Sequence, residues 1–136
     1  VPGVADAIQS LAKDFSLALV SGSNRKDVLW ALESLKVRDR FQIILGAEDY
    51  PRSKPAPDGF LKAVDMLQVE PHEVLVFEDS FAGINSGLAA GLHVAAIECT
   101  NHFNHDQSGA HIRIPDFSGV NSEWVRKSFS SSGKGC

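Results

Sequence analysis

Cysteine is scarce in this chain, and no long apolar run is present. Cys99 and Cys136 are the only cysteines among 136 residues, which is too few for a disulfide framework, so we expect a reducing, cytoplasmic environment. No apolar stretch approaches the roughly 20 residues of a transmembrane helix. Residues 1–20 also lack the charged and then apolar pattern of a signal peptide, and we expect no association with a membrane.

An excess of positive charge is missing as well. The formal net charge is −4, which gives no electrostatic reason to expect nucleic acid as a partner. With 43% hydrophobic and 22% charged residues, the composition is that of a globular chain, and the length suits one domain. We expect a folded core over residues 1–122, followed by a terminal helix and flexible tail over residues 123–136.

Strand-like and helix-like segments alternate along the chain. Short apolar runs that end in polar or glycine residues predict strands at 15–20, 41–45, 74–77 and 93–97, with a weaker edge strand at 111–114. Helical patterns predict helices with core faces at Val4, Ile8, Leu11 and Ala12, at Val28, Leu32 and Leu35, and at Phe60, Leu61, Val64 and Leu67. Two more helices are expected at 80–90 and 122–129, before a frayed tail at 130–136. This alternation predicts an α/β fold, a mainly parallel sheet sandwiched between helices.

Polar residues follow two of the predicted strands. Ser21 ends the first strand and Glu78 with Asp79 ends the third, and ligands of such sheets bind outside the carboxyl ends of the strands. Gly22 lets backbone N–H groups approach an anion, so Ser21 and the loop amides are candidates to hold phosphate oxygens. A structural alternative is that Ser23 or Asn24 caps the following helix, and both roles are compatible.

Lys54 lies in a loop stiffened by proline. Pro55 disfavours the α conformation for Lys54, so an extended lysine loses little further freedom when it points its charge at a phosphate. The alternative is a solvated surface lysine, which is the usual state of this residue type.

Glu78 and Asp79 are the most specific element. Two carboxylates at the mouth of a buried strand are costly without compensation, and Mg²⁺ binds one or two carboxylates together with phosphate oxygens. Successive strand residues face opposite ways, so one acid is expected to bind metal while its neighbour acts through water or orients the loop. The alternative is that Asp79 or Ser80 caps the helix that begins at Phe81.

These motifs resemble those of haloacid dehalogenase superfamily hydrolases, in the β-phosphoglucomutase-like branch of sugar phosphatases and phosphomutases. The matching segments are 19–24, 53–58 and 76–91, and order and spacing agree over about residues 1–120. The resemblance implies a Rossmann-like three-layer core, Mg²⁺ as cofactor and a small phosphorylated metabolite as substrate. The catalytic residues that it implies are Ser21, Lys54 and Asp79, the phosphate and substrate contacts are Ser21, Gly22, Ser23, Asn24 and Lys54, and the metal ligands are Glu78 and Asp79.

One family motif is missing. Family members carry Asp-x-Asp on the central strand, with the first Asp as nucleophile, and no aspartate of this chain has another two residues later. Val1–Val4 resembles the stretch after the family's helical cap, so we expect the nucleophile, the central strand and the cap to lie upstream. The sheet would then have a gap between the strands ending at Ser21 and Glu78, with unpaired edges. An upstream segment or another chain would be needed to complete it.

Other protein classes differ in motif order or in ligands. A response-regulator receiver domain has its acids first and its lysine last, the reverse of the order here. A haloacid dehalogenase proper works without Mg²⁺, whereas the acid pair favours phosphate chemistry. A non-catalytic relative that binds phosphate, metal or a protein partner stays open. Cys99, His102 and His105 lack regular zinc-site spacing, which favours a polar loop, and Trp30 and Trp124 are expected to be packing residues.

Overall fold

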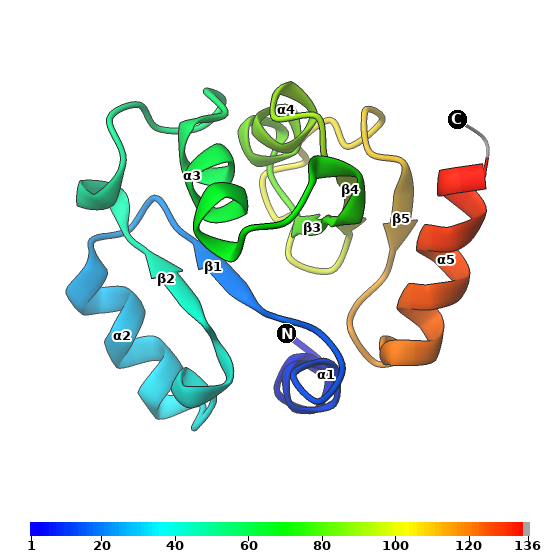
Figure 1. Cartoon of the computed structure of the whole chain (residues 1–136), viewed down its shortest axis with the longest axis horizontal. Helices are drawn as coiled ribbons and strands as arrows, with labels where there is room; N and C mark the ends of the chain where they lie inside the picture. Colours follow the sequence, from blue (N-terminus) through cyan, green and yellow to red (C-terminus); the bar gives the residue numbers. More distant parts are fainter. Residues whose placement is uncertain (135–136) are drawn as a thin grey trace.

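Parallel strands alternate with helices along the chain, as the sequence predicts. The computed structural model describes residues 1–134 (Figure 1). Its elements are α1 (Val4–Leu11), β1 (Ala18–Val20), α2 (Arg25–Ser34), β2 (Ile43–Leu45), α3 (Asp58–Leu67), β3 (Leu75–Glu78), α4 (Phe81–Ala89), β4 (His93–Ile97), β5 (Ile112–Ile114) and α5 (Ser122–Lys134). Short 3₁₀ turns at 38–40, 47–49 and 71–73 join them. The predicted α/β fold class is confirmed.

Most element ends lie within a residue of the predicted ones, with Glu78 as the last residue of β3 rather than the first after it, and β1, β2 and α5 differ by more. β1 and β2 have three residues each, shorter than predicted, and they pair only with each other among the described residues. Helix α5 continues to Lys134 instead of ending at Phe129; the serines at 130–132 lower helix propensity only slightly, and Gly133, which lowers it more, lies in the last turn. The predicted frayed tail is therefore helical over its first part, and residues 135–136 lie outside the described residues.

The strands form two separate parallel sheets. β1 pairs with β2, with Val20 opposite Leu45, and β3–β4–β5 form the second sheet, with Phe77 opposite Ala95. Within residues 1–134 no strand pairing joins β1 to β3. The break falls where the sequence predicts a gap, between the strands that lead to Ser21 and Glu78.

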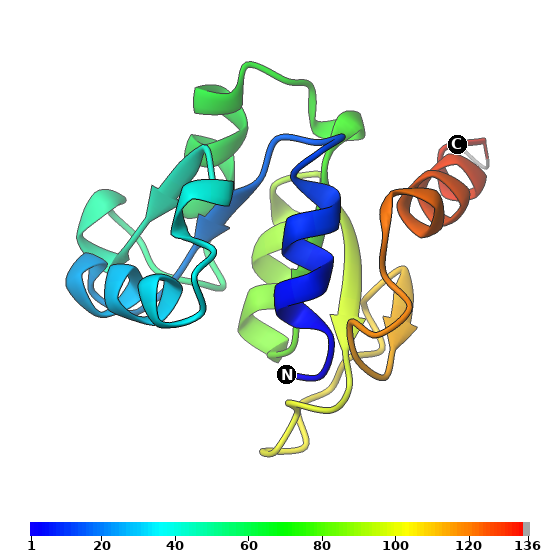
Figure 2. The same cartoon turned by 90° about the horizontal axis from the view of Figure 1, so that it is seen from below.

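Helix α1 lies between the two sheets and packs toward both (Figure 2). Ala7 and Leu11 belong to a buried cluster that also includes the partly buried Phe77 of β3. Ala5 and Ile8 pack against the cluster formed by α2 and the segment that follows it. One short amphipathic helix thus contributes to the cores of both sheets.

Helices α3 and α4 cover the faces of the two sheets that lie opposite α1. Phe60 and Val64 of α3 and Ile84 of α4 share a buried cluster with Val76 and Val94 from the second sheet.

None of the helices within residues 1–134 has both the length and the apolar character that crossing a bilayer requires.

Three residues predicted to pack are exposed instead. Trp30 is 71% exposed, Leu35 48% and Leu61 46%. The inner face of α2 is Val28 and Leu32, four residues apart, so Trp30, midway between them, points to the other side. Helical periodicity identifies a stripe of apolar residues, but the packing of neighbouring elements determines how many of those residues are buried. Trp124 is partly buried and packs beside Phe77, as predicted.

Candidate active site

Lys54 connects the carboxyl ends of the two sheets. Its Nζ donates to the Val20 carbonyl oxygen of β1 at 3.1 Å and forms an ion pair with the Glu78 carboxylate of β3. The same ammonium lies 5.0 Å from the centre of the Phe60 ring, a cation–π arrangement. With its side chain 18% exposed, Lys54 is not the solvated surface lysine of the structural alternative.

Ser21 follows β1 directly and lies beside this lysine contact. Its N–H donates to the Leu45 carbonyl at 2.9 Å, and its Oγ accepts from the Ser23 N–H at 3.1 Å. Because a serine hydroxyl is also a donor, its proton is still available to a ligand. A Cβ added at Gly22 would meet no described atom within 4 Å, so the backbone of this loop is open to an approaching anion.

Two helix caps follow the structural alternatives raised by the sequence. The Asn24 side chain accepts from the Asp27 N–H at 2.9 Å and caps α2. Ser80 Oγ accepts from the Gly83 N–H at 2.9 Å and caps α4. Asp79 is therefore not the cap of α4, and its carboxylate is available for another role.

Tyr50 is a site neighbour that the sequence does not reveal. Its side chain is 7% exposed, and its hydroxyl donates to the Ser21 carbonyl at 2.9 Å. Burial, and then the negative charges of Glu78 and Asp49, raise the pKa of Tyr50. The phenol therefore stays protonated and keeps donating. No local pattern marks this residue, since the contact spans 29 positions of the chain.

Glu78 fits tightly against helix α4. Its side chain is 13% exposed, and a Cβ added at Gly83 would overlap its carboxylate. The sequence predicts that charge at this strand end needs a cation, and Lys54 supplies one to Glu78 in this structure.

Asp79 presents an unpaired carboxylate. Within residues 1–134 no hydrogen bond or ion pair engages its side chain, whereas its backbone carbonyl accepts from Gln107 Nε2 at 2.9 Å. No group of three or more His, Cys, Asp or Glu side chains gathers among the described residues. The carboxylates at this strand end are Glu78 and Asp79, and a pair of this kind fits Mg²⁺, which takes its other ligands from water and phosphate.

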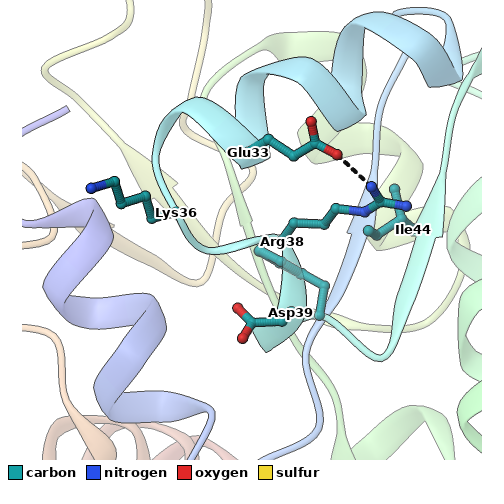
Figure 3. A pocket seen from close by; sticks show the side chains of 6 residues that line it. Glu33, Lys36, Arg38, Asp39 and Ile44 are labelled. Carbon is teal, nitrogen blue, oxygen red and sulfur yellow. Dashed lines mark hydrogen bonds and ion pairs between the residues drawn. The ribbon is translucent and has the colours of Figure 1, made fainter.

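A pocket beside α2 and the segment that follows it contains none of the predicted site residues. It measures about 490 Å³ and is lined by Glu33, Lys36, Arg38, Asp39, Phe41 and Ile44. Figure 3 shows the Glu33–Arg38 ion pair across it. The candidate active site lies instead at the edge formed by Ser21, Lys54, Glu78 and Asp79.

The chain is similar in sequence to phosphatases. The sequence profile of haloacid dehalogenase-like hydrolases matches residues 1–97. Protein CbbY of Rhodobacter capsulatus is 37% identical over 122 residues, covering 87% of this chain and 54% of that protein. Hexitol phosphatase A of Escherichia coli is 34% identical over 94 residues, covering 60% of this chain and 44% of that protein. The chain thus spans about half the length of these relatives.

Solved structures agree with the fold. CbbY of Rhodobacter sphaeroides in complex with phosphate superposes with a TM-score of 0.80 at 25% identity, over 88% of this chain and 55% of that one. The β-phosphoglucomutase of Clostridium difficile gives a TM-score of 0.81 at 21% identity, over 97% and 57%, and supports the fold alone. The predicted resemblance is confirmed: the chain belongs to the haloacid dehalogenase-like hydrolase family.

Proposed function

We propose that this chain is part of a magnesium-dependent enzyme that transfers the phosphoryl group of a small phosphate monoester, a sugar phosphate in particular. One observation carries the proposal. Lys54 is anchored between the ends of β1 and β3, and Asp79, the residue after its partner Glu78, has a carboxylate with no partner among residues 1–134. A fixed positive charge and a free acid at the carboxyl ends of the strands suit the recognition of phosphate and a hard cation.

The loop after β1 would hold the phosphate oxygens. The Ser21 hydroxyl and the Gly22 amide would offer donors just before α2, where the helix dipole favours an anion, while the Ser23 N–H donates to Ser21 Oγ. Asn24 closes this loop through its cap of the helix. Lys54 would balance negative charge on the transferred group, since two of its contacts fix the ammonium and leave donor capacity.

Asp79 is the residue that we assign as a direct metal ligand. Glu78 would orient Lys54 and contribute to the same site from the other side of the strand. When bound, Mg²⁺ would neutralise charge on the phosphate oxygens. We also propose a cytoplasmic location, in keeping with the small number of cysteines.

The nucleophile would be an aspartate outside residues 1–136. We propose that it lies on a strand that fills the gap between β1 and β3, beside Lys54. The phosphoryl group would pass in line to this aspartate and then to water or to a sugar hydroxyl. The split sheet and the half-length match to the relatives support this arrangement.

Hydrolysis by the full-length protein tests the proposed function. We expect phosphate release from para-nitrophenyl phosphate and from hexose phosphates, lost with EDTA and restored by Mg²⁺. Hexitol phosphates and phosphoglycolate are further test substrates, because two relatives are a hexitol phosphatase and a phosphoglycolate phosphatase. If the full-length protein releases no phosphate from any of them with Mg²⁺ present, the non-catalytic alternative replaces this proposal.

A further inference from the structure

Gln107 is a buried polar side chain that no motif accounts for. It lies in the loop between β4 and β5 and is 2% exposed. Its Nε2 donates to the Asp79 carbonyl at 2.9 Å and to the Ile97 carbonyl at 2.8 Å. These two carbonyls lie at the carboxyl ends of the paired strands β3 and β4. The amide therefore links the strand ends beyond the point where the strand pairing stops.

The same loop also contacts the far side of the acidic segment. His105 Nδ1 accepts from the Phe81 N–H, the first of helix α4, at 3.2 Å. Asn101 holds His105 through two hydrogen bonds, of 2.9 Å from its Nδ2 to the His105 carbonyl and of 2.7 Å from the His105 N–H to its Oδ1. The backbone of residues 79–81 is thus held at both ends by one loop.

This backbone support matters because the Asp79 side chain has none. Among the described residues its carboxylate has no partner, so the backbone that carries it, which sets the direction of the Cα–Cβ bond, is what positions this side chain. The Gln107 bond fixes the carbonyl of that same residue. Without the amide, two carbonyls would be left unpaired around a side chain that is nearly fully buried, which is unfavourable unless the segment shifts.

We propose that Gln107 is a positioning residue for Asp79, which aims the carboxylate at the divalent cation of the proposed reaction. The inference rests on the proposed function, since it assigns Asp79 to the metal. Gln107 itself touches neither the cation nor the phosphate. It acts through the Asp79 backbone, and its removal should weaken the metal site first and the binding of the phosphate ester much less.

The experiment uses the full-length protein with Gln107→Met, which keeps the length of the side chain and removes the donor. Gln107→Leu, which removes the amide with a shorter apolar side chain, is the second variant and decides the matter if the first does not fold. Ile84→Val is the control, because it trims a buried core residue of α4 without removing a hydrogen bond. The readouts are Mn²⁺ affinity without substrate, from the electron paramagnetic resonance signal of free Mn²⁺, the Mg²⁺ concentration for half-maximal turnover, and thermal unfolding.

For Gln107→Met we expect about tenfold weaker Mn²⁺ binding, in the range found for groups that orient metal ligands. The Mg²⁺ requirement should rise in parallel, while KM for the phosphate ester at saturating Mg²⁺ stays close to that of the wild type. Ile84→Val should bind Mn²⁺ like the wild type, even where its thermal stability is lower.

Wild-type Mn²⁺ affinity in a folded Gln107 variant would overturn the inference and leave the proposed function standing, whatever happens to stability. An equal loss of affinity in Ile84→Val would also overturn it, because general destabilisation would then suffice. Wild-type protein that neither binds Mn²⁺ nor turns over substrate would refute the proposed function itself, and with it the role of Gln107.

Discussion

The ammonium group of Lys54 is held by a carbonyl, a carboxylate and an aromatic ring, so this one residue joins the ends of two sheets. Glu78, its partner, has a side chain only 13% exposed. Removing the lysine would leave that carboxylate without compensation, which destabilises a protein more than removing both partners. The residue thus combines a structural role with its proposed role toward phosphate.

Two variants distinguish the structural role of Lys54 from its proposed role toward phosphate. For full-length Lys54→Met we expect turnover to fall about a hundredfold or more, as for other losses of charge stabilisation, together with a lower free energy of unfolding. Adding Glu78→Gln should recover part of the stability but none of the turnover. The measurements are steady-state kinetics and urea unfolding. Near-normal turnover by Lys54→Met would show that the assignment of Lys54 is wrong.

Deprotonation of Tyr50 is expected to lower the stability of the folded chain at alkaline pH. Its pKa is raised above the ordinary value of 10.0, first by burial and then by the Glu78 and Asp49 charges. The native state therefore holds the phenol proton more tightly than the unfolded chain does. The resulting stability is fully present below about pH 10 and is lost as the pH rises through the higher native pKa.

Tyr50→Phe should abolish that loss. We expect the free energy of unfolding of the wild type to fall more steeply above pH 10 than that of Tyr50→Phe, measured by urea unfolding from pH 8 to 11. At pH 8 the variant should be less stable by about 1 kcal/mol, the usual contribution of a hydrogen bond. Identical alkaline slopes for the two proteins would contradict the cause assigned to this pKa shift.

Residues at strand ends could be predicted from the sequence, and residues that support them could not. Ser21 and Glu78 each end an apolar run, so the rule for parallel sheets places them at one edge. Tyr50 and Gln107 reach that edge across 29 and 28 positions of the chain. Such contacts exist only after folding, and no local pattern marks them.

Among the elements, helix α4 shows why a glycine is needed at position 83. A Cβ there would overlap the Glu78 carboxylate. At Gly87, on the same helix, a Cβ would lie 2.8 Å from a methyl group of Val94 instead. The two positions share a gain in helix propensity of about 1 kcal/mol on change to alanine, but only one of them faces the site.

Gly83→Ala should therefore displace Glu78 from Lys54 and lower the turnover of the full-length protein about tenfold or more, as expected where charge stabilisation is disturbed. Gly87→Ala is the matched control and should keep turnover near the wild-type value, whatever its packing does to stability. Kinetics and thermal unfolding of both variants give the comparison. Equal turnover in the two variants would count against the Glu78–Lys54 pair as part of the site.

The contact between β4 and α5 predicts sensitivity to acid. His93 stacks on His111 with ring centres 4.2 Å apart and meets Phe129 of α5 edge-on at 5.5 Å. Burial, and then the charge of His111, lower the pKa of His93 from its ordinary value of 6.5. The unfolded chain therefore binds a proton more readily, so stability falls as the pH drops below about 6.5.

A non-titrating ring at position 93 should reduce this effect. For His93→Phe we expect the melting temperature to change less between pH 7.5 and pH 5 than it does for the wild type. Differential scanning calorimetry across that range measures it. If the melting temperature of His93→Phe falls between pH 7.5 and pH 5 as much as that of the wild type, His93 is not the cause of the acid sensitivity.

Element order and type could be predicted from apolar periodicity, and the exposed faces could not. β4 occupies the predicted residues 93–97. The prediction succeeds here because the strand is a continuous apolar run after His93 and is buried at all but that first residue. The predicted stripe of α2 included Leu35, which follows the last residue of the helix and is exposed, and Trp30 was expected to pack although it points outward. Which side of a helix is covered depends on its neighbours, and sequence spacing alone does not contain that information.

For the whole molecule, the break between β1 and β3 is the dominant feature. Among residues 1–134 the two sheets are connected through α1, through Lys54 and through the cluster of α3 and α4 that Val20 of β1 packs against, rather than by strand pairing. Unpaired strand edges favour pairing with another segment. We therefore propose that these 136 residues alone are unstable or self-associate, and that the full-length protein unfolds at a higher temperature.

Calorimetry and sedimentation of the isolated 136-residue chain check this. We expect a broad, low-temperature transition, or association that increases with concentration. A cooperative, high-temperature transition of a monomer would contradict the proposed missing strand.

The Mg²⁺ dependence of turnover by the full-length protein, with Asp79→Asn beside the wild type, tests the central claim most directly. The wild type should lose phosphatase activity in EDTA and regain it with Mg²⁺. Asp79→Asn should stay folded, with turnover lower by about a hundredfold at saturating Mg²⁺. Wild-type turnover that is indifferent to EDTA, or an Asp79→Asn variant with normal Mg²⁺-dependent turnover, would contradict a metal-assisted phosphoryl-transfer site at this edge of the sheet.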